Sequence, residues 1–437
     1  MARISAIVLA LIAGACSEQG SAPPRNLLIV CVDTLRADEL GAYGARPART
    51  PALDRLAQES VVFERAHVAA SWTLPSVGAL FTSLYPSTTK LWTFESRLSG
   101  EFTTRAERFQ SAGFDTHGIA SHIYFDQEYG LQQGFDTFDD ELCQRGGASG
   151  WKEITSPEVS AKAVAWLEQR AARDSGAPWL LFVHFFDAHL PYLDHETAGT
   201  GAPARTERER YQSEISFTDR YVGALLAALA HAGLAADTNV LFFSDHGESF
   251  LEHPPIRRHS YGLYEEELRV PLFLCVPGLA PRRVKEFVRT VDLLPTLLEL
   301  HGLTHDGRVG LEGTSLVPAL RGESQRGAPQ LAEIRLKDGF HANALVRSRH
   351  KLIEDVSNGH LRLFDLEADP RERHDLAQAE PALLAELEAE LRAAVRAAEE
   401  KGARFESGAP VEHTPAELER LHELGYSGED SAPSDER

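Results

Sequence analysis

Residues 26–33, Asn26-Leu27-Leu28-Ile29-Val30-Cys31-Val32-Asp33, decide the fold class, because six consecutive apolar residues end at an acid. An apolar run without polar alternation is typical of a strand that is buried on both faces of a parallel sheet. Asp33 then stands at the carboxyl end of that strand, on the edge where open α/β sheets bind their ligands. An acid at a strand end is also a common turn residue, so a role for Asp33 depends on what meets it there.

Other apolar runs end in polar groups in the same way. Residues 178–186 are followed by Asp187-Ala188-His189, and residues 239–243 by Ser244-Asp245-His246. Helical patterns, such as the long one over residues 205–231, separate these runs. The alternation predicts an α/β fold: a doubly wound, mostly parallel central sheet flanked by helices, with one site along its carboxyl edge. Residues 270–275 contain Pro271, which predicts a strand at a sheet edge.

The pattern changes near residue 313. Short runs at residues 341–346, 350–354 and 361–364 are typical of antiparallel strands, with a hairpin turn at Ser357-Asn358-Gly359, and residues 381–401 form an amphipathic helical pattern. We therefore predict a larger domain over residues 26–312 and a smaller C-terminal α+β subdomain over residues 313–402. Residues 403–437 are predicted as a polar tail with one short helix at 415–424.

The first residues predict export. Arg3 precedes an apolar run over residues 4–13 that is too short to span a bilayer, and Ala13-Gly14-Ala15 precede Cys16. This pattern is typical of a bacterial lipoprotein signal over residues 1–16, with a lipid on Cys16 and a tether over residues 17–25. The expected place is the cell envelope, with membrane contact only through that anchor. Ordinary secretion or a periplasmic location without lipid is the alternative.

Charge and cysteine content narrow the functional classes. The formal net charge of -21 argues against binding to nucleic acid or to anionic lipid. It does not argue against anionic substrates, because a bound metal can reverse the local field. Cys31 and Cys275 lie in apolar runs and are expected to be packed thiols, while Cys143 lies in a polar stretch. No cysteine spacing predicts a disulfide framework or a zinc cluster.

Residues 71–83 form a loop that turns into a helix, since Pro75 suits a first helical turn. Thr73 therefore lies just ahead of a helix N-terminus, where backbone N–H groups and the helix dipole favour an anion or a developing alkoxide. A threonine in that place is more often an N-cap, so the hypothesis of a nucleophile depends on its neighbours.

Asp33, Thr73, Asp245 and His246 converge in this scheme on one edge of the sheet. Two carboxylates and an imidazole predict a divalent-metal site, with the Thr73 oxygen as a further ligand. The imidazole favours zinc or manganese, although calcium or magnesium is possible. A metal lowers the pKa of a bound hydroxyl and makes it a nucleophile near neutral pH.

Four further residues are candidates for a second metal, a general acid or contacts to an anionic substrate: His184, Asp187, His189 and His259. Singly, a histidine is more often a structural or surface group. His189 and His259 are the stronger candidates, because both flank strand ends on the same predicted edge. We assign His189 and His259 to catalysis and keep His184 and Asp187 as weaker candidates for substrate binding.

Several motifs over residues 26–376 occur in the order found in a known family. They are residues 26–33, 35–44 and 50–56, Ser244-Asp245-His246-Gly247-Glu248, and residues 263–272, 292–298, 313–316 and 363–370. In these motifs the chain resembles the sulfatase family within the alkaline phosphatase superfamily. The resemblance implies that Asp33, Asp245 and His246 bind metal and that residue 73 is the nucleophile. It also implies that His189 and His259 contact the substrate anion.

The chain departs from the family pattern at the nucleophile. Formylglycine sulfatases carry Cys or Ser followed by a Pro-Ser-Arg run, whereas this chain has Thr73-Leu74-Pro75-Ser76-Val77. Threonine cannot become formylglycine, and Val77 replaces the arginine. Thr34 stands where many sulfatases have a second acid, and His259 where many have lysine.

These departures decide which ester we expect to be cleaved. An aldehyde hydrate can release sulfate by elimination and a plain threonine ester cannot, but water can cleave a phosphothreonine. We therefore expect a metal-dependent hydrolase of small anionic esters that acts through a covalent Thr73 ester, with phosphodiester-type or phosphonate substrates favoured. A sulfatase without formylglycine is the alternative enzyme, and a catalytically inactive binding lipoprotein of the envelope is the alternative of another class.

Overall fold

The computed structural model describes residues 26–143, 154–173, 176–195, 204–304, 309–323 and 327–424. The predicted signal with Cys16, the predicted tether over residues 17–25 and the end of the predicted tail after residue 424 lie outside these ranges. Within them, no helix is both long enough and apolar enough to cross a membrane.

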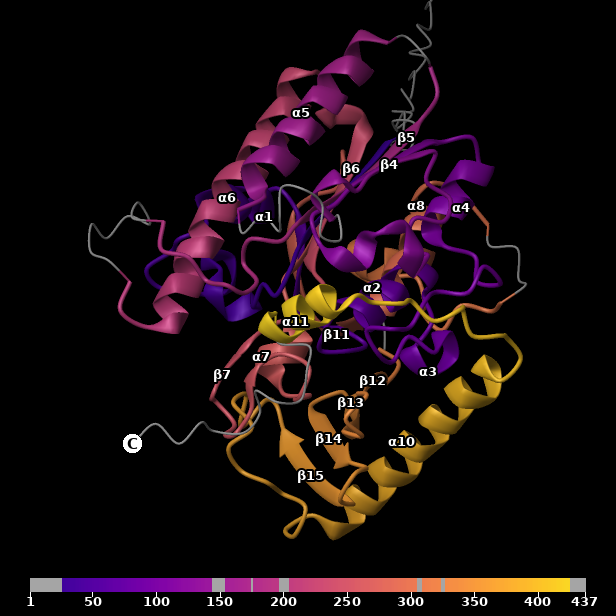
Figure 1. Ribbon diagram of the computed structural model, residues 1–437. Coiled ribbons are helices and arrows are strands. Elements are labelled where there is room, and N and C mark those ends of the chain that lie inside the picture. Colours follow the sequence, from indigo (N-terminus) through magenta and orange to yellow (C-terminus); the bar gives the residue numbers. More distant parts are fainter. Residues whose placement is uncertain are drawn as a thin grey trace, which may run out of the picture.

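A nine-stranded sheet forms the centre of the molecule (Figure 1). Its strand order is β11-β2-β10-β6-β1-β5-β3-β4, and β9 also pairs with β2. The strands are β1 (Asn26–Val32), β2 (Val61–His67), β3 (Asp115–Ile119), β4 (Thr137–Asp139), β5 (Trp179–Phe185), β6 (Thr238–Ser244), β9 (Arg269–Val270), β10 (Leu272–Cys275) and β11 (Arg282–Arg289). β1 runs parallel to both of its neighbours, and β9 and β10 are the antiparallel strands. The predicted mostly parallel sheet is confirmed.

Helices cover both faces of this sheet, which explains why β1 lacks polar alternation. Leu28, Val30 and Val32 pack in one apolar cluster with α1 (Pro51–Gln58), α5 (Ser156–Ala172) and α6 (Glu207–His231). The alternate residues Leu27, Ile29 and Cys31 pack in a second cluster with α2 (Thr73–Thr82), α4 (Arg105–Ser111) and α8 (Leu293–Leu300), which lie on the opposite side of the sheet (Figure 1). Successive residues of a strand point to opposite faces, so both faces of β1 must be apolar.

The prediction of an edge strand at residues 270–275 is wrong. β10 lies inside the sheet, between β2 and β6. Pro271 is tolerated because it falls in the break between β9 and β10, where it takes no part in the ladder. The N–H of Leu272 beside it donates to the hydroxyl of Tyr43 at 2.9 Å.

A separate antiparallel sheet follows, in the order β12-β13-β14-β15. Its strands are β12 (Gln330–Arg335), β13 (His341–Arg347), β14 (His350–Asp355) and β15 (His360–Asp365), and α10 (Pro381–Gly402) packs on it. The sequence predicted the last three strands, their turn at residues 357–359 and the helix, and it missed β12. The boundary at residue 313 stays a prediction. The remaining elements are α3 (Pro86–Thr89), α7 (Glu265–Leu268), α9 (Val317–Leu320), α11 (Pro415–Glu423), β7 (Ser249–Phe250) and β8 (Arg257–Arg258).

The predicted polar tail is wrong for residues 403–424, although its short helix is present as α11. The N–H of Val411 donates to the carbonyl of Glu95 at 2.8 Å. Leu421 and Leu424 are buried in the same apolar cluster as α2, α4 and α8. Because this segment is mostly polar in composition, the sequence carried little signal for the few apolar side chains that attach it to the larger part of the molecule.

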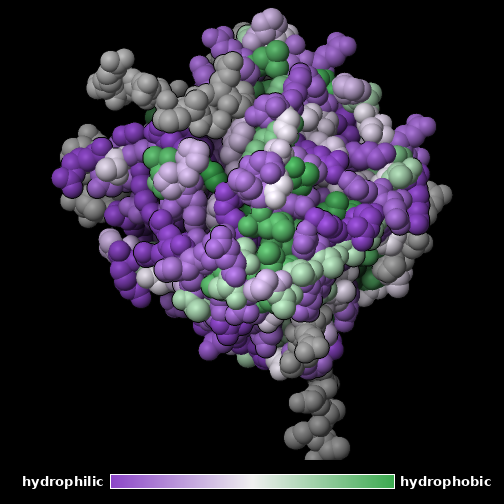
Figure 2. Space-filling model, turned by 90° about the horizontal axis from the view of Figure 1, so that it is seen from below, coloured by the Kyte–Doolittle hydropathy of each residue, from purple (hydrophilic) through white to green (hydrophobic). Residues whose placement is uncertain are grey.

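The surface is largely hydrophilic. Figure 2 shows the face that lies at the bottom of Figure 1, where hydrophilic side chains predominate and apolar ones gather in a band near the centre. Among the described residues, the large apolar side chains that are markedly exposed are Ile154, Leu251 and Val356. The surface is therefore typical of a folded globular protein.

A buried carboxyl group joins the small sheet to the rest. Glu333 of β12 is 1% exposed and accepts bonds from the N–H and the hydroxyl of Ser87, at 3.0 and 2.5 Å. Burial raises the pKa of Glu333 to about 7, whereas an exposed glutamate titrates near about 4.3. Between these values the folded state binds more protons than the unfolded state, so the free energy of unfolding falls as the pH rises.

We expect Glu333→Gln to flatten this fall by up to about 1.4 kcal/mol per pH unit between about pH 4.5 and 7. Urea unfolding of both proteins across that range measures the effect. Glu286→Gln, at an exposed position of β11, serves as the control with little change. Parallel stability curves for wild type and Glu333→Gln would refute the assignment.

Candidate active site

The register of the central strands brings three predicted metal ligands together. Val32 of β1 lies opposite Ser244 of β6, so Asp33 and Asp245 follow the two strands at the same level. Ligand atoms of Asp33, Asp245 and His246 lie within 4.8 Å of one another, and all three residues are buried. The carboxyl edge of the sheet therefore carries one compact acidic group, as the strand ends predicted.

Thr73 meets this group from the other side, as the first residue of α2. Its Oγ1 lies 3.2 Å from Nε2 of His246. The N-cap position belongs to Trp72, whose backbone is extended and whose side chain makes no capping bond, so the N-cap interpretation of Thr73 is wrong. The hydroxyl of Ser76 donates to the carbonyl of Asp245 at 2.5 Å and fixes α2 against the end of β6.

The acidic group fits a divalent cation. Both carboxylate oxygens of Asp33 and Oδ2 of Asp245 are buried and accept no hydrogen bond within the described part of the chain. Two such charges in a low-dielectric interior cost several kcal/mol each unless an opposite charge offsets them. Nδ1 of His246 donates to the carbonyl of Gly247 at 2.9 Å, which leaves the lone pair of the neutral ring on Nε2. Nε2 faces Asp33 and Asp245 at 3.4 and 3.6 Å.

The pKa shifts of the group show the same excess of negative charge. Burial, together with the Asp245 carboxylate, raises the pKa of Asp33 well above its ordinary value. Burial alone would lower the pKa of His246, but the carboxylates of Asp245 and Asp33 outweigh it and raise that pKa. A bound cation would take the place of the proton that these groups hold.

His189 and His259 lie beside the predicted metal ligands. The rings of His246 and His259 are 4.8 Å apart, and so are those of His259 and His189. Nδ1 of His189 donates to the carbonyl of Leu190 at 3.1 Å. Burial lowers the pKa of both His189 and His259 well below the ordinary value, so both are neutral imidazoles near pH 7.

The sequence analysis quoted Glu248 within a motif but gave it no role. Its two carboxylate oxygens lie 3.2 and 3.3 Å from Nδ1 of His259. The hydroxyl of Tyr192 donates to the same carboxylate at 2.5 Å, and burial raises the pKa of Glu248 to about 7. Glu248 therefore orients the ring of His259. The useful signal was its place two residues after His246, on the same strand end.

His184 is not placed to contact a substrate directly. It lies within β5, fully buried, with Nε2 3.3 Å from Oδ2 of Asp33 and its ring 4.6 Å from that of Phe125. Burial lowers its pKa to about 4. It supports Asp33 from behind, and the predicted substrate contact does not fit this placement.

Asp187 has a structural role that the sequence did not predict. Its carboxylate accepts bonds from the N–H and hydroxyl of Thr155 and from the N–H of Ser156, at 2.7, 2.6 and 2.8 Å. These donors are at the start of α5, whose free N–H groups need acceptors. Asp187 therefore caps the start of α5 with both carboxylate oxygens, and its role in substrate binding stays a prediction.

His122 is a further member of the histidine cluster that the sequence analysis missed. Its ring lies 5.8 Å from that of His189 and 6.3 Å from that of His184, and its Nδ1 accepts a bond from the N–H of Tyr124. It follows β3 at the same edge of the sheet. No second metal group accompanies these histidines among the described residues, since Asp33, Asp245 and His246 are the one cluster with suitable spacing.

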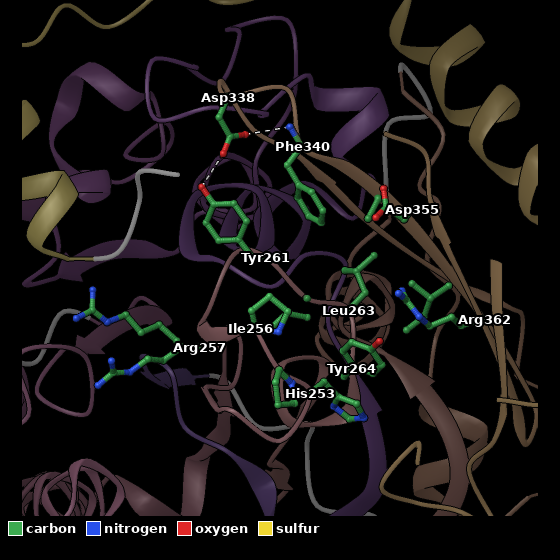
Figure 3. A pocket seen from close by; sticks show the side chains of 16 residues that line it. His253, Ile256, Arg257, Tyr261, Leu263, Tyr264, Asp338, Phe340, Asp355 and Arg362 are labelled. Carbon is green, nitrogen blue, oxygen red and sulfur yellow. Dashed lines mark hydrogen bonds between the residues drawn. The ribbon is translucent and has the colours of Figure 1, made fainter. Parts of the chain in front are cut away.

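The loop that carries His259 links the reaction centre to the small sheet. The N–H of Ser260 donates to the carbonyl of Ser71 at 3.2 Å, which ties this loop to the one before Thr73. Farther along, the hydroxyl of Tyr261 donates to Asp338 at 2.9 Å (Figure 3). Residues on both sides of His259 also line a cavity of about 430 Å³ against β13 and β14 (Figure 3).

Comparisons with known proteins agree with this arrangement. The family model described as Sulfatase matches residues 25–303, and the model described as N-sulphoglucosamine sulphohydrolase, C-terminal, matches residues 259–401. The choline-sulfatase of Rhizobium meliloti (strain 1021) is 25% identical over 425 residues, covering 81% of this chain and 82% of that protein. The ulvan-active sulfatase of Formosa agariphila is 26% identical over 404 residues, covering 82% of this chain and 78% of that protein.

Solved structures share the fold. A crystal structure of Ps i-CgsB with k-i-k-neocarrahexaose superposes with a TM-score of 0.73 at 20% identity, covering 94% of this chain and 99% of that one. The phosphonate monoester hydrolase of Agrobacterium radiobacter gives a TM-score of 0.70 at 21% identity, with 90% and 100% of the two chains covered.

We expect zinc or manganese to stabilise the wild-type protein, by about 2.7 kcal/mol at a hundredfold excess over its Kd, and Asp33→Asn to lose this response. Thermal unfolding with and without the metal measures both. Asp187→Asn is the matched control: it loses charged hydrogen bonds and about 1.5–3 kcal/mol of stability but keeps the metal response. An unchanged response in Asp33→Asn would show that the metal binds elsewhere.

Proposed function

Because the chain belongs to the sulfatase family, whose members are hydrolases acting on ester bonds, we propose that it cleaves small anionic esters through a covalent bond to Thr73. One observation carries the proposal: Oγ1 of Thr73 lies 3.2 Å from Nε2 of His246, a member of the buried Asp33-Asp245-His246 group. A threonine whose only task was to start a helix would not need two buried acids beside it.

Asp33, Asp245 and His246 would hold a divalent metal ion, with the Thr73 hydroxyl as a further ligand. When bound, the metal supplies positive charge that lowers the pKa of this hydroxyl and offsets the charge of the ester. The mixed oxygen and nitrogen ligands favour zinc or manganese over calcium or magnesium.

The residues of the chain account for the bonds and the proton. Oγ1 of Thr73 forms a bond to phosphorus, and the bond from phosphorus to the leaving alcohol breaks with its electron pair on the alcohol oxygen. Nε2 of His259 takes the proton of the Thr73 hydroxyl and passes it to that oxygen, while Glu248 holds Nδ1 of the same ring. Water then attacks phosphorus, the bond from phosphorus to Oγ1 of Thr73 breaks with its electron pair on Oγ1, and one proton of the water passes to Oγ1, which restores the protein. His189 lies beside His259 and contacts the anion.

Phosphoryl substrates suit this nucleophile better than sulfuryl substrates. A threonine sulfate has no route to eliminate sulfate, whereas water can cleave a phosphothreonine. The phosphonate monoester hydrolase with the same fold supports a phosphonate substrate. The names of the choline and ulvan sulfatases support the second candidate, hydrolysis of a sulfate ester without formylglycine.

A catalytically inactive binding lipoprotein is the alternative of another class. The buried group and the placement of Thr73 count against it, because a protein without catalysis has no need to keep charged side chains out of water. The lipoprotein-type signal that ends at Cys16 supports a place in the cell envelope for either function.

We expect Thr73→Ala to lower kcat on the order of a thousandfold or more while the fold and metal binding persist. Thr73→Ser keeps a hydroxyl and should retain measurable turnover. The assay uses aryl phosphodiesters, phosphonate monoesters, phosphate monoesters and sulfate esters, with and without zinc or manganese. Persistent activity in Thr73→Ala would remove Thr73 from its role, and turnover of sulfate esters alone would overturn the phosphoryl preference.

Glu248→Gln tests the proton transfer through His259. We expect a loss of about a hundredfold with phenyl esters, whose leaving oxygen needs the proton, and a much smaller loss with nitrophenyl esters. Glu214→Gln is the matched control, because Glu214 is equally buried, has a pKa raised to about 7 by burial and pairs with His195 at 2.7 Å. Equal losses for both leaving groups would contradict the role of the pair.

A further inference from the structure

A cavity of about 320 Å³ lies between α11 and the loops that carry Thr73 and His259. On one side it is lined by Trp72, which precedes Thr73, and by Ser260, which follows His259. On the other side it is lined by Leu418 and His422 of α11. The cavity is therefore lined by the chain neighbours of both residues that the proposed reaction uses.

The position of α11 is fixed by contacts on both sides of it. Before the helix, Nε2 of His413 donates to the carbonyl of Phe94 at 3.0 Å, and the two rings lie 5.5 Å apart. Within and after it, Leu421 and Leu424 are fully or almost fully buried in the main apolar cluster. The helix that lines this side of the cavity is therefore anchored in the apolar core.

The lining of the cavity is suited to a flat apolar group. Its apolar members are Trp72, Phe94, Tyr261, Leu336 and Leu418, and the charged side chains of Lys337 and Asp338 lie at one part of the lining. The hydroxyl of Tyr261 donates to Asp338, which also lines the cavity, so these two polar groups are paired with each other (Figure 3). Aromatic rings stack on aromatic or other flat apolar surfaces.

The same helix also comes near the anion-contacting histidine. Leu418 and His422 are one turn apart and share a face, so Arg420 between them points to another side. Arg420 is mostly buried, with 15% of its side chain exposed. Burial, His259 and the charge of Arg420 all lower the pKa of His189.

We propose that this cavity binds the leaving alcohol of the ester, that the preferred alcohol is aromatic or otherwise flat and apolar, and that Leu418 of α11 sets the size it accepts. The inference rests on the proposed function and adds to it the class of leaving group. It also gives the C-terminal segment, which the sequence predicted as a polar tail, a part in choosing the substrate.

Leu418→Trp in the full-length protein tests the cavity by filling it. For methyl, phenyl and 2-naphthyl esters of one phosphonic acid, we expect KM to rise about tenfold or more for the naphthyl ester and little for the methyl ester, with kcat almost unchanged. Glu419→Trp adds the same side chain on the exposed face of α11 and should leave all three KM values as they are. Leu418→Ala, which enlarges the cavity, should favour the naphthyl ester and covers the case in which the larger residue impairs folding.

Calorimetric titration with 2-naphthol separates this inference from the proposed function. Binding to the Thr73→Ala protein that is lost in Thr73→Ala/Leu418→Trp supports the cavity, even if no ester is hydrolysed and the proposed function fails. Hydrolysis of esters by the wild type, with no competition by 2-naphthol and equal KM changes for all three esters in Leu418→Trp, would overturn the inference and leave the proposed function standing.

Discussion

Two carboxylates that lie out of water, side by side, are the constraint on which this structure depends. Asp33 and Asp245 are at most 1% exposed, and the parallel pairing of β1 with β6 places them at the same level. Their mutual repulsion in a low-dielectric interior requires a positive charge nearby. The pKa shifts of Asp33 and His246 show that a proton partly meets this need, and a divalent cation would meet it fully. Thr73 lies beside this group, so the positive charge that the buried acids require would also activate the Thr73 hydroxyl.

The surrounding residues hold this group in one arrangement. Ser76 fixes α2 to the end of β6, and the bond from Ser260 to Ser71 fixes the His259 loop to the loop before Thr73. Glu248 and Tyr192 determine the orientation of the His259 ring. The bonds of Ser76, Ser260 and Tyr192 join segments that are far apart in the sequence, so the geometry of the centre depends on the whole fold. The same holds for α11, which comes from near the C-terminus and lines the cavity next to the loops of the centre.

The sequence predicted what local pattern controls. Apolar runs located the central strands, the residue after each run located the acidic group, and helical periodicity located α6 and α10 to within a few residues. What the sequence could not supply were pairings between distant segments. Asp187 could not be known to cap α5, because the donors of Thr155 belong to another element. Pro271 suggested an edge because its location in a break between two strands depends on their partners.

The same distinction between local signals and distant pairings applies to the candidate active site. Asp33, Asp245, His246 and Thr73 were found because strand ends and a helix start are local signals. Glu248 and His122 were missed because their roles depend on neighbours that are close only in the folded chain, namely His259 for the one and His189 for the other. The attachment of residues 403–424 was missed for a related reason, since the buried side chains of Val411, Leu421 and Leu424 are enough to attach a mostly polar segment.

The central claim is that the oxygen of Thr73 forms the covalent bond. Rapid acid quenching of the protein during turnover of an ester with radioactive phosphorus, followed by digestion and mass spectrometry, tests it directly. The account predicts label on the peptide that contains Thr73, and its loss when turnover is complete. Turnover without label on that peptide, or label on a histidine of the cluster, would contradict it.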